Sequence, residues 1–232
     1  MGHLKRCLSL AKTLDTRVQP TFLIASEDSK VLKSIAKAGF RTHRLPTGLT
    51  YVEEVKFYPA SSRNIILDLV HRENLTRPIL LDQYLTELSN LGYQVAFIDG
   101  LGAEAFRSKT APRVMACIQP YWGVDGESPP NSEHWLRGPE YSLVDDIYQK
   151  GFKKRSKGTI ANILITFGGA DPHENTLKVL TGVLGRSASL KFRVIIGPSF
   201  CSEHIENIRR LSNGDLIELV FAPEDLLVHY HW

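Results

Sequence analysis

Cysteine, long apolar runs and strong net charge are all scarce in this sequence. Its three cysteines, Cys7, Cys117 and Cys201, lie far apart, and no Cys/His spacing is typical of a metal site or a disulfide framework. No apolar run approaches the roughly 18–20 residues that cross a bilayer, and the first residues lack the layout of a signal peptide. The net charge of +3 gives no reason to expect a nucleic-acid partner. We therefore expect a cytoplasmic protein with reduced thiols, no metal or other cofactor and no integral membrane segment, whose oligomeric state the sequence does not predict.

Hydrophobic residues make up 43% of the chain, and their spacing alternates between that of helices and that of strands. The pattern predicts strands at 21–25, 40–45, 78–82, 93–99, 113–118, 160–167, 192–196 and 216–221. It predicts helices at 3–14, 31–36, 61–70, 143–152, 174–184 and 202–211, with a further short helix that ends near Gly92. Strands separated by helices are typical of βαβ units, so we expect an α/β fold with a mainly parallel sheet.

Two interruptions divide this alternation. Residues 119–140 are rich in proline and glycine, which leaves little room for regular structure. The basic run 153–157 then precedes a new strand, and such runs are typical of linkers or solvated faces. We therefore predict an N-terminal lobe over 1–150 and a second lobe over 158–232. The second lobe has about three predicted strands, fewer than a doubly wound lobe usually has, so we expect it to be incomplete.

Gly2 and His3 stand at the predicted start of the first helix. Unpaired backbone amides at a helix start favour an anion or a carbonyl group. A histidine at this position is suited to act as a base, because the helix dipole favours its neutral form. The alternative is that His3 is an exposed polar residue without a role.

Gly168 and Gly169 follow an apolar predicted strand and lead into a predicted helix. In this context glycines let backbone amides approach a phosphate group. A plain tight turn explains the same residues equally well. The sequence has no Walker motif and no GxGxxG fingerprint.

Asp82-Gln83-Tyr84 falls at the carboxyl end of the predicted strand 78–82. In open α/β sheets this edge faces the ligand. The alternative is an aspartate that caps the following helix. Asp99 ends the strand predicted at 93–99 and has the same two interpretations.

Five segments carry a resemblance when they are taken together and in order: GHLKRCLSLA, LLDQY, RGPEYSLV, ILITFGGADPHENTLKVL and RVIIGP. They resemble the UDP-2,4-diacetamido-2,4,6-trideoxy-β-L-altropyranose hydrolases of pseudaminic acid biosynthesis and the related spore coat polysaccharide biosynthesis family. The resemblance implies a glycosyltransferase-B-type fold with two Rossmann-like lobes. It also implies release of UDP from a UDP-sugar by water attack at the anomeric carbon, without a required metal.

The resemblance also implies roles for particular residues. The family's base corresponds to His3, and its strand-end Asp-x-Tyr corresponds to Asp82 and Tyr84. Residues expected to bind the substrate are Gly2, Arg6, Gly168 and Gly169.

Three departures from the family bear on this interpretation. Family members have a strand and another glycine before Gly-His, where this chain has Met1. Their second lobe continues into a glycine-rich turn and an acidic residue that hold uridine and ribose, which would lie beyond Trp232. The arginine usual after GPEY is absent from 142–145. We therefore expect either a chain truncated at both ends or a shortened relative with impaired nucleotide binding. The alternatives to a hydrolase are a glycosyltransferase of the same fold and a non-catalytic remnant that binds nucleotide sugars.

Overall fold

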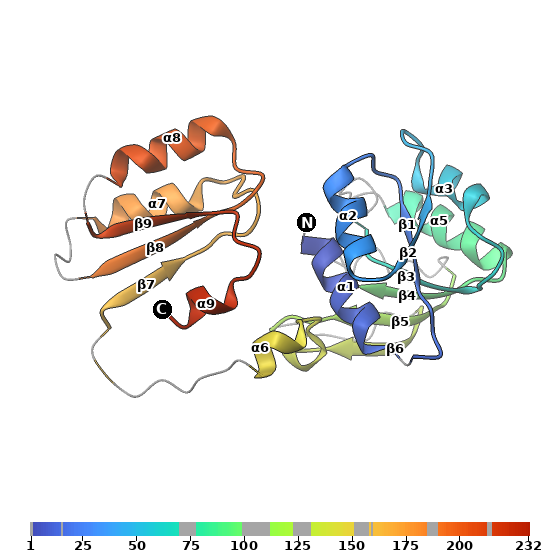
Figure 1. Ribbon diagram of the computed structural model, residues 1–232. Helices are drawn as coiled ribbons and strands as arrows, with labels where there is room; N and C mark the ends of the chain where they lie inside the picture. The colour runs from blue at the N-terminus through green and yellow to red at the C-terminus, as the bar shows by residue number, and fades with distance from the viewer. Residues whose placement is uncertain are drawn as a thin grey trace. The chain divides into compact units, whose positions relative to one another are not determined.

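The computed structural model describes residues 2–14, 16–69, 78–98, 112–122, 131–150, 158, 160–184, 190–212 and 215–232 (Figure 1). The chain forms two compact units. One spans His3–Val144, and the other spans Asp145–Trp232. Each unit has a hydrophobic core of its own. No helix in the described ranges combines the length and the apolar character that crossing a bilayer requires.

The first unit alternates short helices and strands. Its elements are α1 (Gly2–Thr13), β1 (Thr21–Ile24), α2 (Ser29–Lys37), β2 (Arg41–Arg44), α3 (Tyr51–Glu54), η1 (Val55–Phe57), β3 (Asn64–Leu67), α5 (Pro78–Asn90), β4 (Gln94–Ile98), β5 (Val114–Gln119), β6 (Ser132–Arg137) and η3 (Pro139–Tyr141). All its strands pair in parallel, in a two-stranded sheet β1-β2 and a four-stranded sheet β3-β4-β5-β6. The prediction of an α/β fold with parallel pairing is confirmed.

The core of this unit lies between α5 and the four-stranded sheet. Leu81, Tyr84, Leu85 and Leu88 follow helical spacing on α5, and each is at most 1% exposed. They belong to one cluster with Phe97 of β4. Burial of a large apolar side chain contributes about 1.5–3 kcal/mol, so this stripe holds α5 on the sheet.

Two sequence predictions in this unit are wrong, and they are adjacent. The helix predicted over 61–70 is the strand β3, and the strand predicted over 78–82 is the first part of α5. Ile65 and Ile66 are β-branched and favour a strand, whereas leucines favour a helix. Pro78 stands at the first helical position, where its missing N–H costs nothing.

A further strand lies in the segment predicted to be irregular. β6 pairs with β5 at the edge of the sheet, with Trp135 opposite Cys117. Pro129 and Pro130 precede β6 and Gly138 follows it, so the breakers flank the strand rather than interrupt it.

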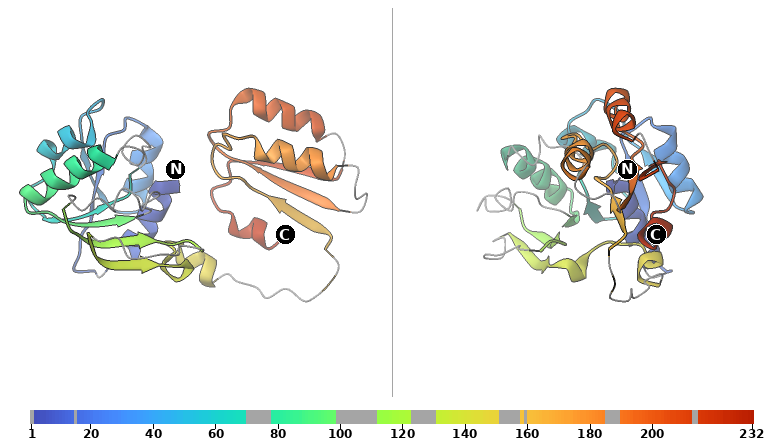
Figure 2. Two further views of the ribbon diagram at one scale, coloured as in Figure 1. Left: turned by 180° about the vertical axis from the view of Figure 1, so that it is seen from behind. Right: turned by 90° about the vertical axis from the view of Figure 1, so that its left-hand side faces the viewer.

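The second unit is built on a three-stranded parallel sheet of order β7-β8-β9. Its elements are α6 (Asp146–Lys150), β7 (Asn162–Ile165), α7 (Asn175–Val183), β8 (Lys191–Ile196), α8 (Ser202–Leu211), β9 (Ile217–Phe221) and α9 (Leu227–Tyr230). Figure 2 shows α7 and α8 on one face of the sheet and α9 on the other. Leu180 and Ile208 from the two covering helices are fully buried in the core.

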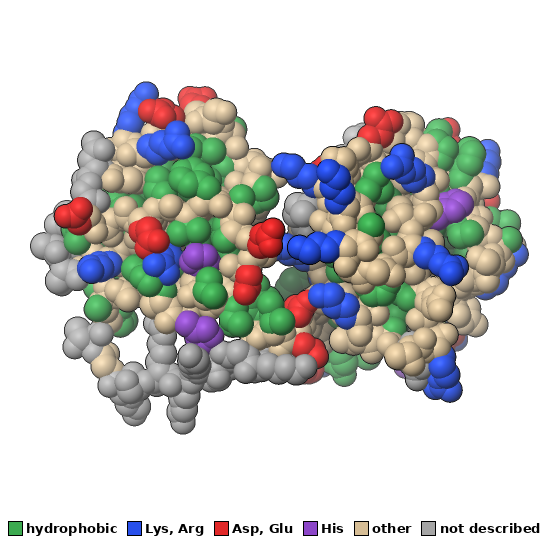
Figure 3. Space-filling model, viewed as in Figure 1, with side chains coloured by type: hydrophobic (Ala, Val, Ile, Leu, Met, Phe, Trp, Pro, Cys, Tyr) green, Lys and Arg blue, Asp and Glu red, His purple; other side chains and the backbone are tan. Residues whose placement is uncertain are grey.

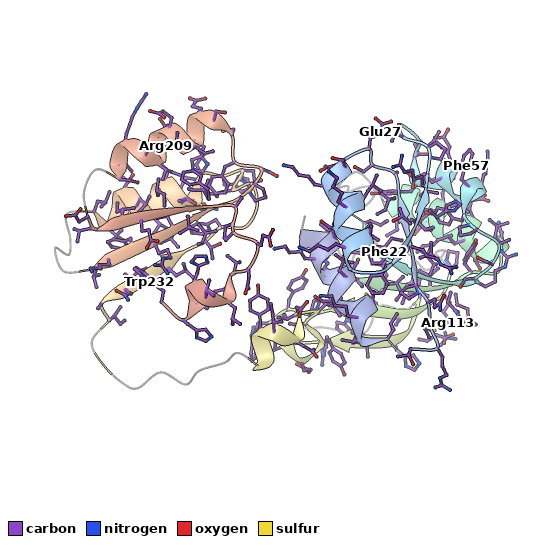
Figure 4. All side chains as sticks on the ribbon, viewed as in Figure 1. Phe22, Glu27, Phe57, Arg113, Arg209 and Trp232 are labelled. Atoms are coloured by element: carbon purple, nitrogen blue, oxygen red, sulfur yellow. The ribbon has the colours of Figure 1, made fainter. Side chains whose placement is uncertain are left out.

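Two cation–aromatic contacts lie on opposite faces of this sheet. Arg209 of α8 lies 5.3 Å from the ring centroid of Phe221, and Arg193 of β8 lies 4.2 Å from that of Trp232 (Figure 4). Each contact places a guanidinium over the face of a ring, where the ring quadrupole attracts it. They hold α8 on one face and the Trp232 end of the unit on the other.

Candidate functional site

Four side chains converge where β3 ends, at the carboxyl edge of the four-stranded sheet. Asp68 directly follows β3, and His3, Arg6 and Cys7 come from the first two turns of α1. Positions i, i+3 and i+4 share one face of a helix, so α1 presents all three to the same carboxylate. The carboxyl edge of a parallel sheet is where α/β proteins bind ligands.

The Asp68 carboxylate is buried, with its side chain 2% exposed, and both of its oxygens have partners. Oδ1 accepts hydrogen bonds from His3 Nδ1 at 2.6 Å and from Arg6 Nη2. Oδ2 accepts from Arg6 Nε at 2.5 Å and from the Cys7 thiol, whose Sγ lies 3.4 Å away. Arg6 therefore binds the carboxylate in a bidentate manner, through Nε and Nη2, which is the strongest form of this pairing.

The contacts determine the tautomer of His3. An ionised carboxylate oxygen can only accept, so at 2.6 Å the His3 Nδ1 must carry the proton. Arg6 Nη2 also lies 3.0 Å from Nδ1, but a guanidinium nitrogen can only donate, and its closer acceptor is Asp68 Oδ1. The lone pair of the neutral ring is therefore on Nε2. The His3 side chain is 36% exposed, so a water molecule or a substrate can reach it.

The charge balance keeps Asp68 ionised. Burial by itself raises the pKa of Asp68, but the hydrogen bonds from Arg6 and His3 outweigh it and hold the pKa below its ordinary value. Burial, followed by the adjacent Asp68 carboxylate, raises the pKa of Cys7 to about 12. Cys7 is therefore a neutral thiol that donates a hydrogen bond, and it is not a nucleophile.

Asp82 and Tyr84 do not stand at a strand end, because the strand predicted for them is the helix α5. Tyr84 is 1% exposed, and its hydroxyl lies 2.7 Å from the hydroxyl of Tyr58. Burial raises the pKa of Tyr84 well above its ordinary value. One carboxylate oxygen of Asp82 is buried without a hydrogen-bond partner among the described residues. Asp99 lies outside the described residues.

Gly168 and Gly169 form the turn between β7 and α7, in the second unit. Gly168 has a φ of +76°, a conformation that side chains rarely adopt. Gly169 has no such φ, and a Cβ added at either glycine would meet nothing within 4 Å. Neither the backbone conformation at position 169 nor the atoms around it therefore require a glycine there.

A surface groove of about 630 Å³ lies on the first unit, away from Asp68. Its lining includes Arg63 and Tyr93, which directly precede β3 and β4. The groove is therefore at the amino ends of these strands, opposite to the edge where α/β sheets bind ligands. We do not assign the candidate site to it.

Cations gather on the two helices nearest the start of the chain. Lys5 and Lys12 on α1 and Lys30, Lys33 and Lys37 on α2 are exposed, and neither helix contains an acidic residue. Figure 3 shows Lys and Arg side chains on the face that carries α1 and α2. Such a face gives a favourable potential for an anionic small molecule. Within the described ranges, no group of three or more His, Cys, Asp or Glu is arranged to hold a metal ion.

Asp68 is the residue of this site that sequence reasoning missed. Ile65-Ile66-Leu67-Asp68 and Leu80-Leu81-Asp82 both end an apolar run with Leu-Asp, and the sequence pattern predicts the strand end at the second. The signal that could have separated them is the pair of β-branched residues in the first run.

The chain resembles one archaeal protein over most of its length. An uncharacterized protein of Methanocaldococcus jannaschii is 27% identical over 233 residues, which cover 94% of this chain and 45% of that protein. The chain thus spans about half the length of this relative. It matches no protein-family model. The relative is uncharacterized and points to no activity.

Proposed function

We propose that this chain is a nucleotide-sugar hydrolase of the glycosyltransferase-B type. It would release UDP from a UDP-2,4-diacetamido-2,4,6-trideoxyhexose by water attack at the anomeric carbon, in surface polysaccharide or nonulosonic acid biosynthesis. The observation that carries the proposal is the Asp68–His3 pair, in which a buried carboxylate orients a half-exposed imidazole at the carboxyl edge of a parallel sheet.

In this proposal His3 is the general base. Water attacks the anomeric carbon and loses a proton to His3 Nε2, while the bond from that carbon to the diphosphate oxygen breaks and UDP leaves with its electron pair. Asp68 keeps Nδ1 protonated and stabilises the imidazolium that forms, as a carboxylate does beside a catalytic histidine. Arg6 holds Asp68 in place through two nitrogens, so in this proposal it positions the carboxylate and does not bind the substrate directly.

The position of Asp68 changes which residue fills the family's strand-end role. Asp68 holds the place at the end of a strand that Asp82 was expected to hold. Val70 stands two residues further on, so the tyrosine of the Asp-x-Tyr pattern has no counterpart there. We therefore assign Tyr84 to the core, where its hydroxyl pairs with Tyr58.

Two further observations support an anionic nucleotide as the substrate. The exposed lysines of α1 and α2 favour a molecule that carries a diphosphate. Gly169 has no left-handed φ, and a Cβ at this position would meet nothing within 4 Å. This is expected of a turn that a ligand approaches closely. In the proposal this turn contacts the diphosphate.

The first test is turnover of the UDP-sugar by the wild-type chain, His3→Ala and Asp68→Asn. Loss of a general base lowers kcat by about 10²–10⁴-fold, and Asp68→Asn should lower kcat in the same direction because the amide carries no charge to stabilise the imidazolium. His134→Ala is the matched control, since His134 is an exposed histidine of β6. Equal turnover by His3→Ala and the control would contradict the role of His3.

The second test follows the oxygen of the attacking water. Turnover in H₂¹⁸O should leave UDP unlabelled, because the broken bond joins carbon and oxygen. Label in the β-phosphate of UDP would show attack at phosphorus and refute the mechanism. Sugar that appears on an added acceptor instead of as free sugar would identify a glycosyltransferase.

A further inference from the structure

The connection between β8 and α8 lies directly against the Gly168–Gly169 turn. A Cβ added at Gly197 would stand 2.4 Å from the carbonyl oxygen of Gly169 and 2.5 Å from that of Gly168. The backbone N–H of Ser199 donates a hydrogen bond to Gly169 O at 2.9 Å. Only a glycine at position 197 allows the two backbones to approach this closely.

The other end of the turn is held by a buried carboxylate. Asp171 accepts hydrogen bonds from the backbone N–H groups of Asn175 and Thr176, at 2.9 and 2.8 Å. Asp171 has a φ of +42°, which costs free energy for a residue that is not glycine. Nε2 of His204, a residue of α8 that is 2% exposed, lies 3.8 Å from the Asp171 carboxylate. The same connection and helix thus contact the turn at both ends.

The two sides of the turn differ in what they meet. The side toward Gly197 is in contact with backbone, whereas Cβ atoms at Gly168 and Gly169 would point into open space. A residue on the contacted side can change the conformation of the turn without touching a ligand on the open side.

We infer that Gly197 is a positioning residue for the diphosphate of the substrate, acting through the Gly168–Gly169 turn. The inference rests on the proposed function, which places the diphosphate on this turn. Ordinary Cβ contacts begin near 3.4 Å, so an alanine at position 197 must displace the turn by about 1 Å. A displacement of this size weakens interactions that depend on exact placement by about 10–100-fold.

The test compares the affinities of the wild-type chain and Gly197→Ala for UDP and for inorganic pyrophosphate by calorimetry. We expect Kd to rise by about tenfold or more for both ligands, and by the same factor, because the change acts on the diphosphate. Because the diphosphate is also the leaving group, turnover should fall together with affinity, whereas the affinity for uridine, which lacks the diphosphate, should stay within about twofold. A purely structural defect would weaken the binding of uridine as well.

Gly182→Ala is the control, because a Cβ at this glycine of α7 meets nothing within 4 Å. It should leave both affinities unchanged. If Gly197→Ala does not fold, His204→Phe replaces it: this variant keeps a ring to stack on Phe200 but loses the nitrogen that faces Asp171. Here too we expect weaker binding of both ligands.

Three outcomes have distinct meanings. Unchanged affinity in a folded Gly197→Ala or His204→Phe protein would overturn the inference while the proposed function stands. Weaker binding of UDP with unchanged binding of pyrophosphate would also overturn it. A wild-type chain that binds neither ligand would refute the proposed function itself, and the inference with it.

Discussion

Asp68 and Glu54 are buried carboxylates of the same unit, and their surroundings shift their pKa values in opposite directions. Asp68 is paired with Arg6 and His3, and these contacts hold its pKa below the ordinary value despite burial. Glu54 is 5% exposed in α3, and burial raises its pKa to about 7. At the scale of single residues, a cation within hydrogen-bond distance thus decides whether a buried carboxyl stays charged.

Glu54 predicts a pH dependence of stability. In the folded chain Glu54 keeps its proton up to about pH 7, whereas in the unfolded chain it loses the proton near its ordinary pKa of 4.5. The folded state therefore binds more protons between these values, and the free energy of unfolding should fall as pH rises through this window, by at most about 3 kcal/mol. Glu54→Gln should remove this part of the slope in urea unfolding at pH 5 and pH 7.5.

The matched control is Glu87→Gln, which changes an exposed glutamate of α5. This variant should keep the pH dependence of the wild-type chain. A Glu54→Gln variant with the full wild-type slope would show that another group is responsible.

At the scale of elements, the N-terminus of α7 is closed by the chain's own Asp171. Its carboxylate accepts from the amides of Asn175 and Thr176, so these donors are not available to a phosphate. The helix begins at Asn175, three residues after Pro172. In the proposed function the diphosphate therefore contacts the turn before α7 and not the end of the helix.

Removing this cap should destabilise the second unit. Asp171→Ala deletes one buried and one partly buried hydrogen bond and should lower the free energy of unfolding by about 1–2 kcal/mol, whereas Asp171→Asn keeps one acceptor and should lose less. Asp28→Ala, which removes the exposed cap of α2, is the comparison in the first unit. Hydrogen exchange of the α7 amides should respond to Asp171→Ala and not to Asp28→Ala. The reverse pattern would contradict the assignment.

At the scale of the whole molecule, the residues that the structure describes form two cores without a shared residue. One surrounds α5 and the strands β3 to β5, and the other surrounds α7, α8 and β8. Such units can unfold separately, because unfolding one core breaks no apolar contact within the other.

Two core variants test this independence. Leu85 and Leu180 are at most 1% exposed, one in each core, and replacement by alanine costs about 2–5 kcal/mol at such sites. Leu85→Ala should lower hydrogen-exchange protection in β4 and leave β8 unchanged, and Leu180→Ala should do the opposite. Equal loss of protection in both strands after either change would show that the units unfold as one.

Most elements could be predicted from local patterns. The apolar runs at β1, β4, β5, β7, β8 and β9 and the helical stripes of α1, α2, α7 and α8 correspond closely to the structure. The helix predicted to end near Gly92 is the second part of α5. β3 and the first part of α5 could not be predicted, because both begin from short apolar segments that end in Leu-Asp. Pairing of Ile65 with Val95 and packing of the α5 stripe on β4 decided between strand and helix, and both are contacts between distant residues.

The sequence by itself determined the parallel α/β class and pointed to His3, because the spacing of apolar residues and the start of a helix are local properties. Only the tertiary structure decided that His3 faces Asp68, 65 residues away, and that Asp82 and Tyr84 lie on a helix packed in the core. A carboxylate and its partners converge when a strand end and a helix meet in space. No periodicity along the chain encodes that meeting.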